Sequence, residues 1–178
     1  MNDCGIVQFV IAWACATLLP MKKLSQYLAV LLVTAWVGGL WATGYLAVPV
    51  LFYAQPDRQL AGMLAGQMFT LVGYLGMVCG TYLLIQRLGV SGRAALRQWL
   101  FWIIAAMLLI TLVLQFGIQP VMAELKLQAL PAAVMHSELA GQFKMWHGVS
   151  SIAYLIQSLL GVLLILMTPR ASSSYSNS

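Results

Sequence analysis

The chain has 178 residues, of which 62% are hydrophobic and 7% are charged, against about 45–50% and about 25% in soluble domains. A chain with this composition has too few polar residues to cover a water-soluble core. A bilayer, which is itself apolar, can accommodate such a chain. The net charge of +5 comes from basic residues dispersed along the chain, which argues against a nucleic-acid-binding surface. The composition predicts an integral membrane protein with no appended soluble domain.

The first apolar stretch in chain order, residues 5–19, is short for a membrane span, and no basic residue precedes it. The absence of a basic segment argues against a secretory signal peptide. Two interpretations stay open for residues 1–20. They form a short extra N-terminal helix, or they are an over-extended gene start and the chain begins at Met21, ahead of Lys22 and Lys23.

Four longer apolar stretches follow, and each is long enough, at about 1.5 Å per residue, to cross about 30 Å of hydrocarbon as a helix. We therefore predict an all-α polytopic membrane protein: one domain over residues 21–168 that forms a bundle of four transmembrane helices. The polar, serine-rich residues 169–178 are expected to be a disordered tail. The four stretches run from about Leu28 to Phe52, Leu60 to Leu84, Trp99 to Ile118 and Met145 to Met167.

Turn-forming residues mark the connections between these stretches. Gln55-Pro56-Asp57 indicates a tight turn after the first one. The connection from Gln119 to about Lys144 is longer and contains two prolines. We expect it to hold a short helix at the external interface, and we expect Ser137 to cap the helix that enters the fourth span.

The basic residues predict the orientation of the spans. Arg58, Lys126 and Lys144 share one side with Asp57, Glu124 and Glu138, and the opposite side holds six of the nine basic residues. The positive-inside rule then places the beginning of the first strong span and the C-terminus in the cytoplasm. The six residues are Lys22, Lys23, Arg87, Arg93, Arg97 and Arg170.

Glycine recurs at helical spacing in the second span. Because lipid gives helices no hydrophobic reason to associate, small residues promote contact by letting backbones approach closely. The pattern favours close packing within the bundle and allows a homo-oligomer through the glycine faces. The residues are Gly62, Gly66, Gly73, Gly76 and Gly80, with Gly38, Gly39 and Gly44 in the first span.

A weak internal repeat joins the two halves of the chain. Pro49-Val50 near the end of the first span matches Pro120-Val121 after the third, and Leu64 to Gln67 matches Leu139 to Gln142. Such matches are compatible with a parallel duplication about an axis normal to the membrane. Chance is the favoured explanation in a chain rich in alanine, glycine and leucine.

The fourth span carries a polar stripe on one helix face. Unpaired polar groups are costly in lipid, so this face should point into the bundle. There the groups either form interhelical hydrogen bonds or line a polar cavity for a small solute or ion, with His147 at its outer mouth. The stripe comprises His147, Ser150, Ser151, Tyr154, Gln157, Ser158 and Gly161. Its expected partners are Thr111, Gln115 and Gln119 in the third span and Gln67 and Thr70 in the second.

Soft ligands gather in and beside the external loop and keep a metal- or haem-handling role open. No hydrolase, P-loop, dinucleotide or zinc-protease motif is present, and all four acidic residues lie outside the predicted spans. We therefore predict no enzymatic activity, no resident metal and no cofactor. Cys4, Cys15 and Cys79 form no CxxC pair and are expected to be small buried residues. The soft ligands are Met122, Met135, His136, Met145 and His147.

Several runs of this chain resemble the transmembrane protein 205-like family, over about Leu24 to Leu166. They are Trp36-Val37-Gly38-Gly39-Leu40, Pro49-Val50-Leu51-Phe52, Asp57-Arg58 with Ala61-Gly62 and Phe69, and Phe143 with Trp146-His147-Gly148-Val149-Ser150-Ser151. The resemblance implies a four-helix protein of the bacterial inner membrane, like the family's bacterial members, which are described as a domain of unknown function. It implies no established chemistry. It points to Arg58, Phe143, His147 and Ser151 as the positions that would inherit a function.

Our expectation is a non-enzymatic inner-membrane protein that binds or passes a small solute or ion through the polar interior of the bundle. The alternatives are a membrane scaffold or accessory subunit that transports nothing and, third, a protein that handles metal or haem at the external face. The bilayer is the expected partner, and nucleic acid is not.

Overall fold

A computed structural model of the chain describes residues 24–129, 135 and 137–173. Within this part the regular secondary structure is helical, and four helices are long and apolar enough to cross a membrane. They are span 1 (Leu24–Ala54), span 2 (Arg58–Arg97), span 3 (Trp99–Gln128) and span 4 (Ala140–Thr168). The predicted all-α class and the four spans are confirmed. The predictions for residues 1–20, for His136 and for residues 174–178 lie outside the described residues.

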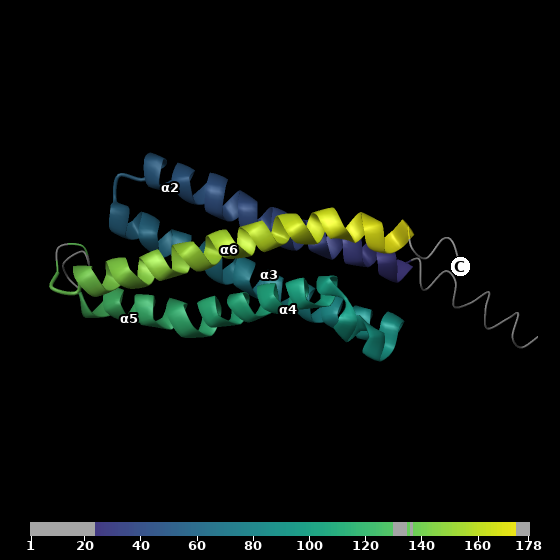
Figure 1. Cartoon of the computed structure of the whole chain (residues 1–178). Coiled ribbons are helices and arrows are strands. Elements are labelled where there is room, and N and C mark those ends of the chain that lie inside the picture. Colours follow the sequence, from purple (N-terminus) through teal and green to yellow (C-terminus); the bar gives the residue numbers. More distant parts are fainter. Residues whose placement is uncertain (1–23, 130–134, 136, 174–178) are drawn as a thin grey trace, which may run out of the picture.

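Three of the four spans consist of consecutive helical segments (Figure 1). Span 1 continues from an α-helix over residues 24–41 into the π-helix η1 (Ala42–Ala47) and α2 (Val48–Ala54). Span 2 comprises α3 (Arg58–Ser91) and the 3-10 helix η2 (Gly92–Arg97). Span 3 comprises α4 (Trp99–Leu112), the π-helix η3 (Val113–Ile118) and α5 (Gln119–Gln128), and span 4 is α6 (Ala140–Ser173).

The two π-helical segments precede the two prolines of the weak repeat. Pro49 follows η1 and Pro120 follows η3, each near the first position of the next α-helix. Proline lacks an N–H, and its ring clashes with the carbonyl four residues earlier, so a wider turn before it lets the helix continue. The expected connection from Gln119 to about Lys144 therefore begins with α5, which continues span 3 to Gln128, and part of the segment in which a short interfacial helix was expected lies outside the described residues.

Short connections join the first three spans. Asp57 caps α3: its Oδ1 accepts hydrogen bonds from the backbone N–H groups of Gln59 and Leu60, at 2.8 and 3.2 Å. This confirms the predicted tight turn. Gly92, with φ of 53°, ends α3 in a backbone conformation that favours glycine. Before span 4, Ser137 Oγ accepts from the N–H of Leu139 at 3.3 Å, close to the predicted cap.

The spans pack side by side. The beginning of span 1 and the end of α6 lie at one end of the molecule, and the turn between α2 and α3 lies at the other (Figure 1). Trp36, fully buried in span 1, lies at the centre of the apolar core. The outer surface is also apolar: Leu71 and Leu109, for example, are 69% and 62% exposed. Such a surface suits lipid. The core residues are Val33, Trp36, Val37, Leu40, Cys79, Leu83, Leu100, Ile104, Met107 and Leu164.

The glycines of α3 divide into two groups. A Cβ at Gly76 or Gly80 would meet the Trp36 ring at 2.4 or 2.9 Å, and a Cβ at Gly73 would meet Gln115 Oε1 at 2.3 Å. These three positions are therefore filled from inside the molecule. Gly62 and Gly66 are open by comparison, with no side-chain atom nearer than 4.0 Å.

Candidate functional site

Polar side chains are buried where spans 1, 3 and 4 meet. We call the five of them the interior polar cluster. Gln157 is 1% exposed and Gln115 is 8% exposed. Such groups are stable inside a membrane protein when they find hydrogen-bond partners. The five residues are Thr43, Thr111, Gln115, Gln157 and Ser158.

Hydrogen bonds link this cluster across the spans. Gln157 Nε2 in α6 donates to Thr111 Oγ1 in α4 at 2.7 Å, and that hydroxyl donates to the carbonyl of Met107 at 2.9 Å. On the other side of α6, the hydroxyl of Tyr45 in η1 donates to Ser158 Oγ at 3.0 Å. The cluster thus connects span 4 to both span 1 and span 3.

Tyr154 lies one helical turn before Gln157 and Ser158 on α6. Its hydroxyl donates to the carbonyl of Leu40 in span 1. Its ring packs edge-on against Phe69 of α3, with the centroids 5.3 Å apart, and against Tyr45 at 6.3 Å. A Cβ at Gly44 would lie 2.4 Å from the Tyr154 ring, so the glycine of η1 makes room for it.

Two side chains of the interior, Gln115 and Trp36, have unused hydrogen-bonding capacity among the described residues. Gln115 lies in η3 against Gly73 and forms no hydrogen bond among the described residues. The indole N–H of Trp36 is buried and likewise has no acceptor there. Buried polar groups are normally paired, so this part of the interior has room in its hydrogen-bonding pattern for a partner.

The other predicted site residues lie outside the interior polar cluster. His147 and Ser151 are exposed, and Ser150 is half-exposed. The hydroxyls of both serines donate to the carbonyl of His147, each at 2.8 Å, and are thereby satisfied within their own helix. Three candidates from the other spans also lie outside it: Gln119 is half-buried, and Gln67 and Arg58 are exposed.

Sequence reasoning missed Thr43 and Tyr45 in η1. Both follow an apolar stretch in which no polar stripe is visible, and the π-helical turn changes the face on which they lie. The signal in the sequence is Pro49, because a proline inside a long apolar span indicates a local departure from α-helical geometry.

A second group of contacts lies at the end of the molecule near the α2–α3 turn. Lys126 Nζ on α5 donates to the carbonyl of Gly62 on α3 at 3.1 Å. The same ammonium lies 5.7 Å from the centroid of the Phe143 ring on α6. That ring stacks on His147, with centroids 6.1 Å apart and planes 10° apart. Lys126 thus joins three spans at this end.

The metal hypothesis concerns soft ligands in and beside the external loop, of which His136 lies outside the described residues. Among the described residues there is no group of three or more His, Cys, Asp or Glu side chains that could hold a metal ion. Met135 and Met145 are exposed.

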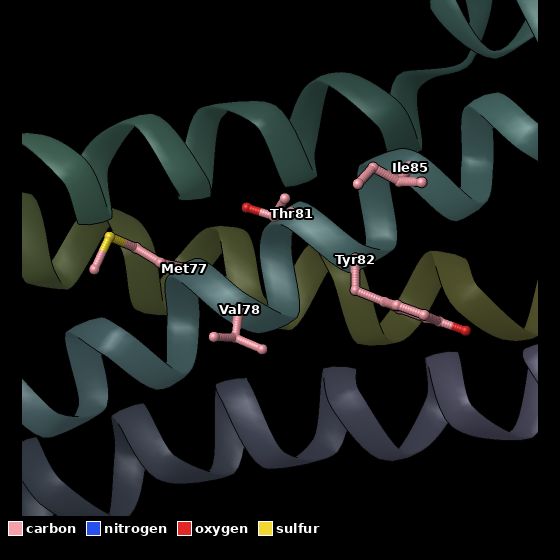
Figure 2. A pocket seen from close by; sticks show the side chains of 5 residues that line it. All are labelled: Met77, Val78, Thr81, Tyr82 and Ile85. Carbon is pink, nitrogen blue, oxygen red and sulfur yellow. The ribbon is translucent and has the colours of Figure 1, made fainter.

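A shallow apolar groove runs along α3 (Figure 2). Of its lining residues, Thr81 and Tyr82 carry hydroxyl groups, and Val78 and Ile85 are largely exposed. The groove lies on the outer apolar surface of span 2 and is separate from the interior polar cluster. It is lined by Met77, Val78, Thr81, Tyr82 and Ile85.

The four apolar spans define a multi-pass membrane protein, and its polar cluster lies within them. Residues 31–131, more than half of the 178-residue chain, match the model of a family described as a domain of unknown function, DUF4149. The chain belongs to this family. No curated protein and no solved structure matches it.

Proposed function

We propose that this chain is a bacterial inner-membrane protein, related to the transmembrane protein 205-like family, that binds or passes a small polar solute or ion through the interior polar cluster. We propose no enzymatic activity. The observation that carries the proposal is Gln115: this side chain is 8% exposed and has no hydrogen-bond partner among the described residues. An unpaired amide within a membrane span is costly, and a bound solute would supply the missing partner.

The proposal predicts that Gln115→Leu abolishes solute binding without unfolding the protein. A panel of small polar solutes and monovalent ions is screened by thermal unfolding of the purified protein in detergent. A solute present at about 100 times its Kd stabilises a protein by about 2.7 kcal/mol. We expect at least one panel member to raise the Tm of the wild type and to have no effect on Gln115→Leu. Tyr154→Phe should weaken the response.

Gln67→Leu is the matched control, because Gln67 is an exposed glutamine of α3. It should keep the full response. An equal response in Gln115→Leu and the wild type would rule out the interior polar cluster as the binding site.

One observation favours a different function, a membrane scaffold that moves nothing. The interior is densely packed: the Trp36 ring packs against Gly76 and Gly80, and Val37 packs against Gly161. A scaffold would bind partners through its outer surface, for example a second copy at Gly38, where an added Cβ would meet nothing within 4 Å. It would show no response in the solute screen and would retain a partner protein during purification.

The proposed orientation places Arg93 of η2 in the cytoplasm and Lys144 outside. In cells with a permeabilised outer membrane, we expect a membrane-impermeant maleimide to label Lys144→Cys and to leave Arg93→Cys unlabelled until the inner membrane is opened. The cysteine-free chain carrying neither substitution is the control. Labelling of Arg93→Cys while the inner membrane is still closed would contradict the topology.

A further inference from the structure

Lys126 is a half-buried cation held between three spans. It lies near the end of α5, where its Nζ donates to the carbonyl of Gly62, 3.1 Å away. A Cβ on Gly66, one turn further along α3, would lie 4.0 Å from Nζ. The two glycines therefore give the ammonium direct access to the backbone of α3.

The ammonium also has an aromatic neighbour. Its Nζ lies 5.7 Å from the centroid of Phe143 on α6, a distance at which the ring face attracts a cation. Phe143 in turn stacks on His147. The carbonyl and the ring fix the position of Nζ, and neither of them neutralises its charge.

No carboxylate of the described residues forms an ion pair with Lys126. Asp57 accepts from the backbone at the beginning of α3, and Glu124 Oε1 accepts from Gln128 Nε2 at 3.1 Å. An ammonium has three N–H donors, and one of them is used by Gly62. Among the described residues, the other two donors of Lys126 have no partner and its charge has no counter-charge. A half-buried cation of this kind has the chemistry of an anion site.

We propose that Lys126 Nζ, positioned by the Gly62 carbonyl and the Phe143 ring, binds a phosphate-type oxyanion at this end of the molecule. Lysine binds phosphate as a compact point charge. Lys126 lies close to the end of span 3, at Gln128, where a membrane span meets the headgroup layer and its phosphates. The oxyanion is either a phospholipid headgroup or free phosphate. This site is separate from the interior polar cluster and does not depend on its function.

Native mass spectrometry of the detergent-purified chain tests the proposal. The protein is mixed with equal amounts of phosphatidylglycerol and phosphatidylcholine that carry identical acyl chains. We expect the wild type to retain phosphatidylglycerol preferentially. In Lys126→Met the ratio of bound phosphatidylglycerol to bound phosphatidylcholine should fall at least fivefold, an effect of about 1 kcal/mol. Lys126→Arg should keep the wild-type ratio. Lys144→Met is the matched control, because Lys144 is an exposed lysine of the same end and should behave as the wild type.

A second variant keeps the charge and obstructs the site. Gly66→Leu places a side chain beside Nζ, at a position with no atom nearer than 4.0 Å, so the fold should accept it while phosphatidylglycerol binding falls. Far-UV circular dichroism checks the helix content of each variant. If Lys126→Met fails to fold, Gly66→Leu decides the result.

A competition experiment distinguishes a phospholipid headgroup from free phosphate as the bound oxyanion. If millimolar inorganic phosphate displaces phosphatidylglycerol from the wild type, the site accepts free phosphate; if it does not, the site is specific to the lipid headgroup. Both outcomes support the proposal. It is overturned if folded Lys126→Met or Gly66→Leu binds phosphatidylglycerol as the wild type does, or if Lys144→Met loses as much as Lys126→Met.

Discussion

Trp36→Ala is expected to lower the free energy of unfolding by about 3 kcal/mol, at the lower end of the range for large-to-small changes in soluble cores. Trp36 is 0% exposed and packs on Gly76 and Gly80 of α3. In detergent the unfolded helices stay in an apolar environment, so the loss comes from dispersion contacts and the cavity rather than from transfer to water. Unfolding by sodium dodecyl sulfate, followed by circular dichroism, measures the change.

Trp99→Ala is the control for this experiment. Trp99 is 78% exposed at the beginning of α4, so its removal should change the stability of the packed helices by less than about 0.5 kcal/mol. Similar losses for the two variants would show that tryptophan content, rather than the contact between Trp36 and α3, determines stability.

Gly76→Ala is expected to destabilise the protein by about 1–3 kcal/mol, the usual cost of overpacking a filled interior. The added Cβ would lie 2.4 Å from Trp36 Nε1 and 3.1 Å from Cδ1 of the same ring. The ring is rigid and fully buried, so either the indole or α3 itself has to move. The same unfolding assay measures the loss.

Gly38→Ala provides the matched comparison, because a Cβ there meets nothing within 4 Å. Alanine is favoured over glycine in a helix by about 1 kcal/mol, so this variant should equal or exceed the wild type in stability. If Gly76→Ala were as stable as Gly38→Ala, the close contact between span 1 and α3 would not be a determinant of the fold.

The spans were predictable because lipid imposes a single strong constraint, a run of apolar residues long enough to cross it. Their ends were harder to predict. The helix of span 3 continues through Pro120 to Gln128, because the π-helical turn of η3 accommodates the proline. The helix α6 begins at Ala140, several residues before the predicted fourth span at about Met145. Apolar content alone does not mark this beginning.

The candidate site was predictable where one α-helix sets the geometry. Tyr154, Gln157 and Ser158 lie on a regular part of α6, and each contacts another span as the stripe indicated. The row Thr111, Gln115 and Gln119 crosses η3, where the helical period changes, and Gln119 is less buried than the other two. The contact of Lys126 with Gly62 joins residues 64 positions apart, and no local pattern encodes it.

The two π-helical segments also set the direction in which the outer parts of spans 1 and 3 face. In each, a backbone N–H bonds five residues back, from Val48 to Thr43 and from Gln119 to Leu114. Such a turn is equivalent to one inserted residue, and one residue rotates everything beyond it by about 100° around the helix axis. Lys126 lies beyond η3, so this rotation contributes to the direction in which Lys126 points toward α3. In this protein the number of residues in a span, as well as their identity, determines which side chains face the other spans.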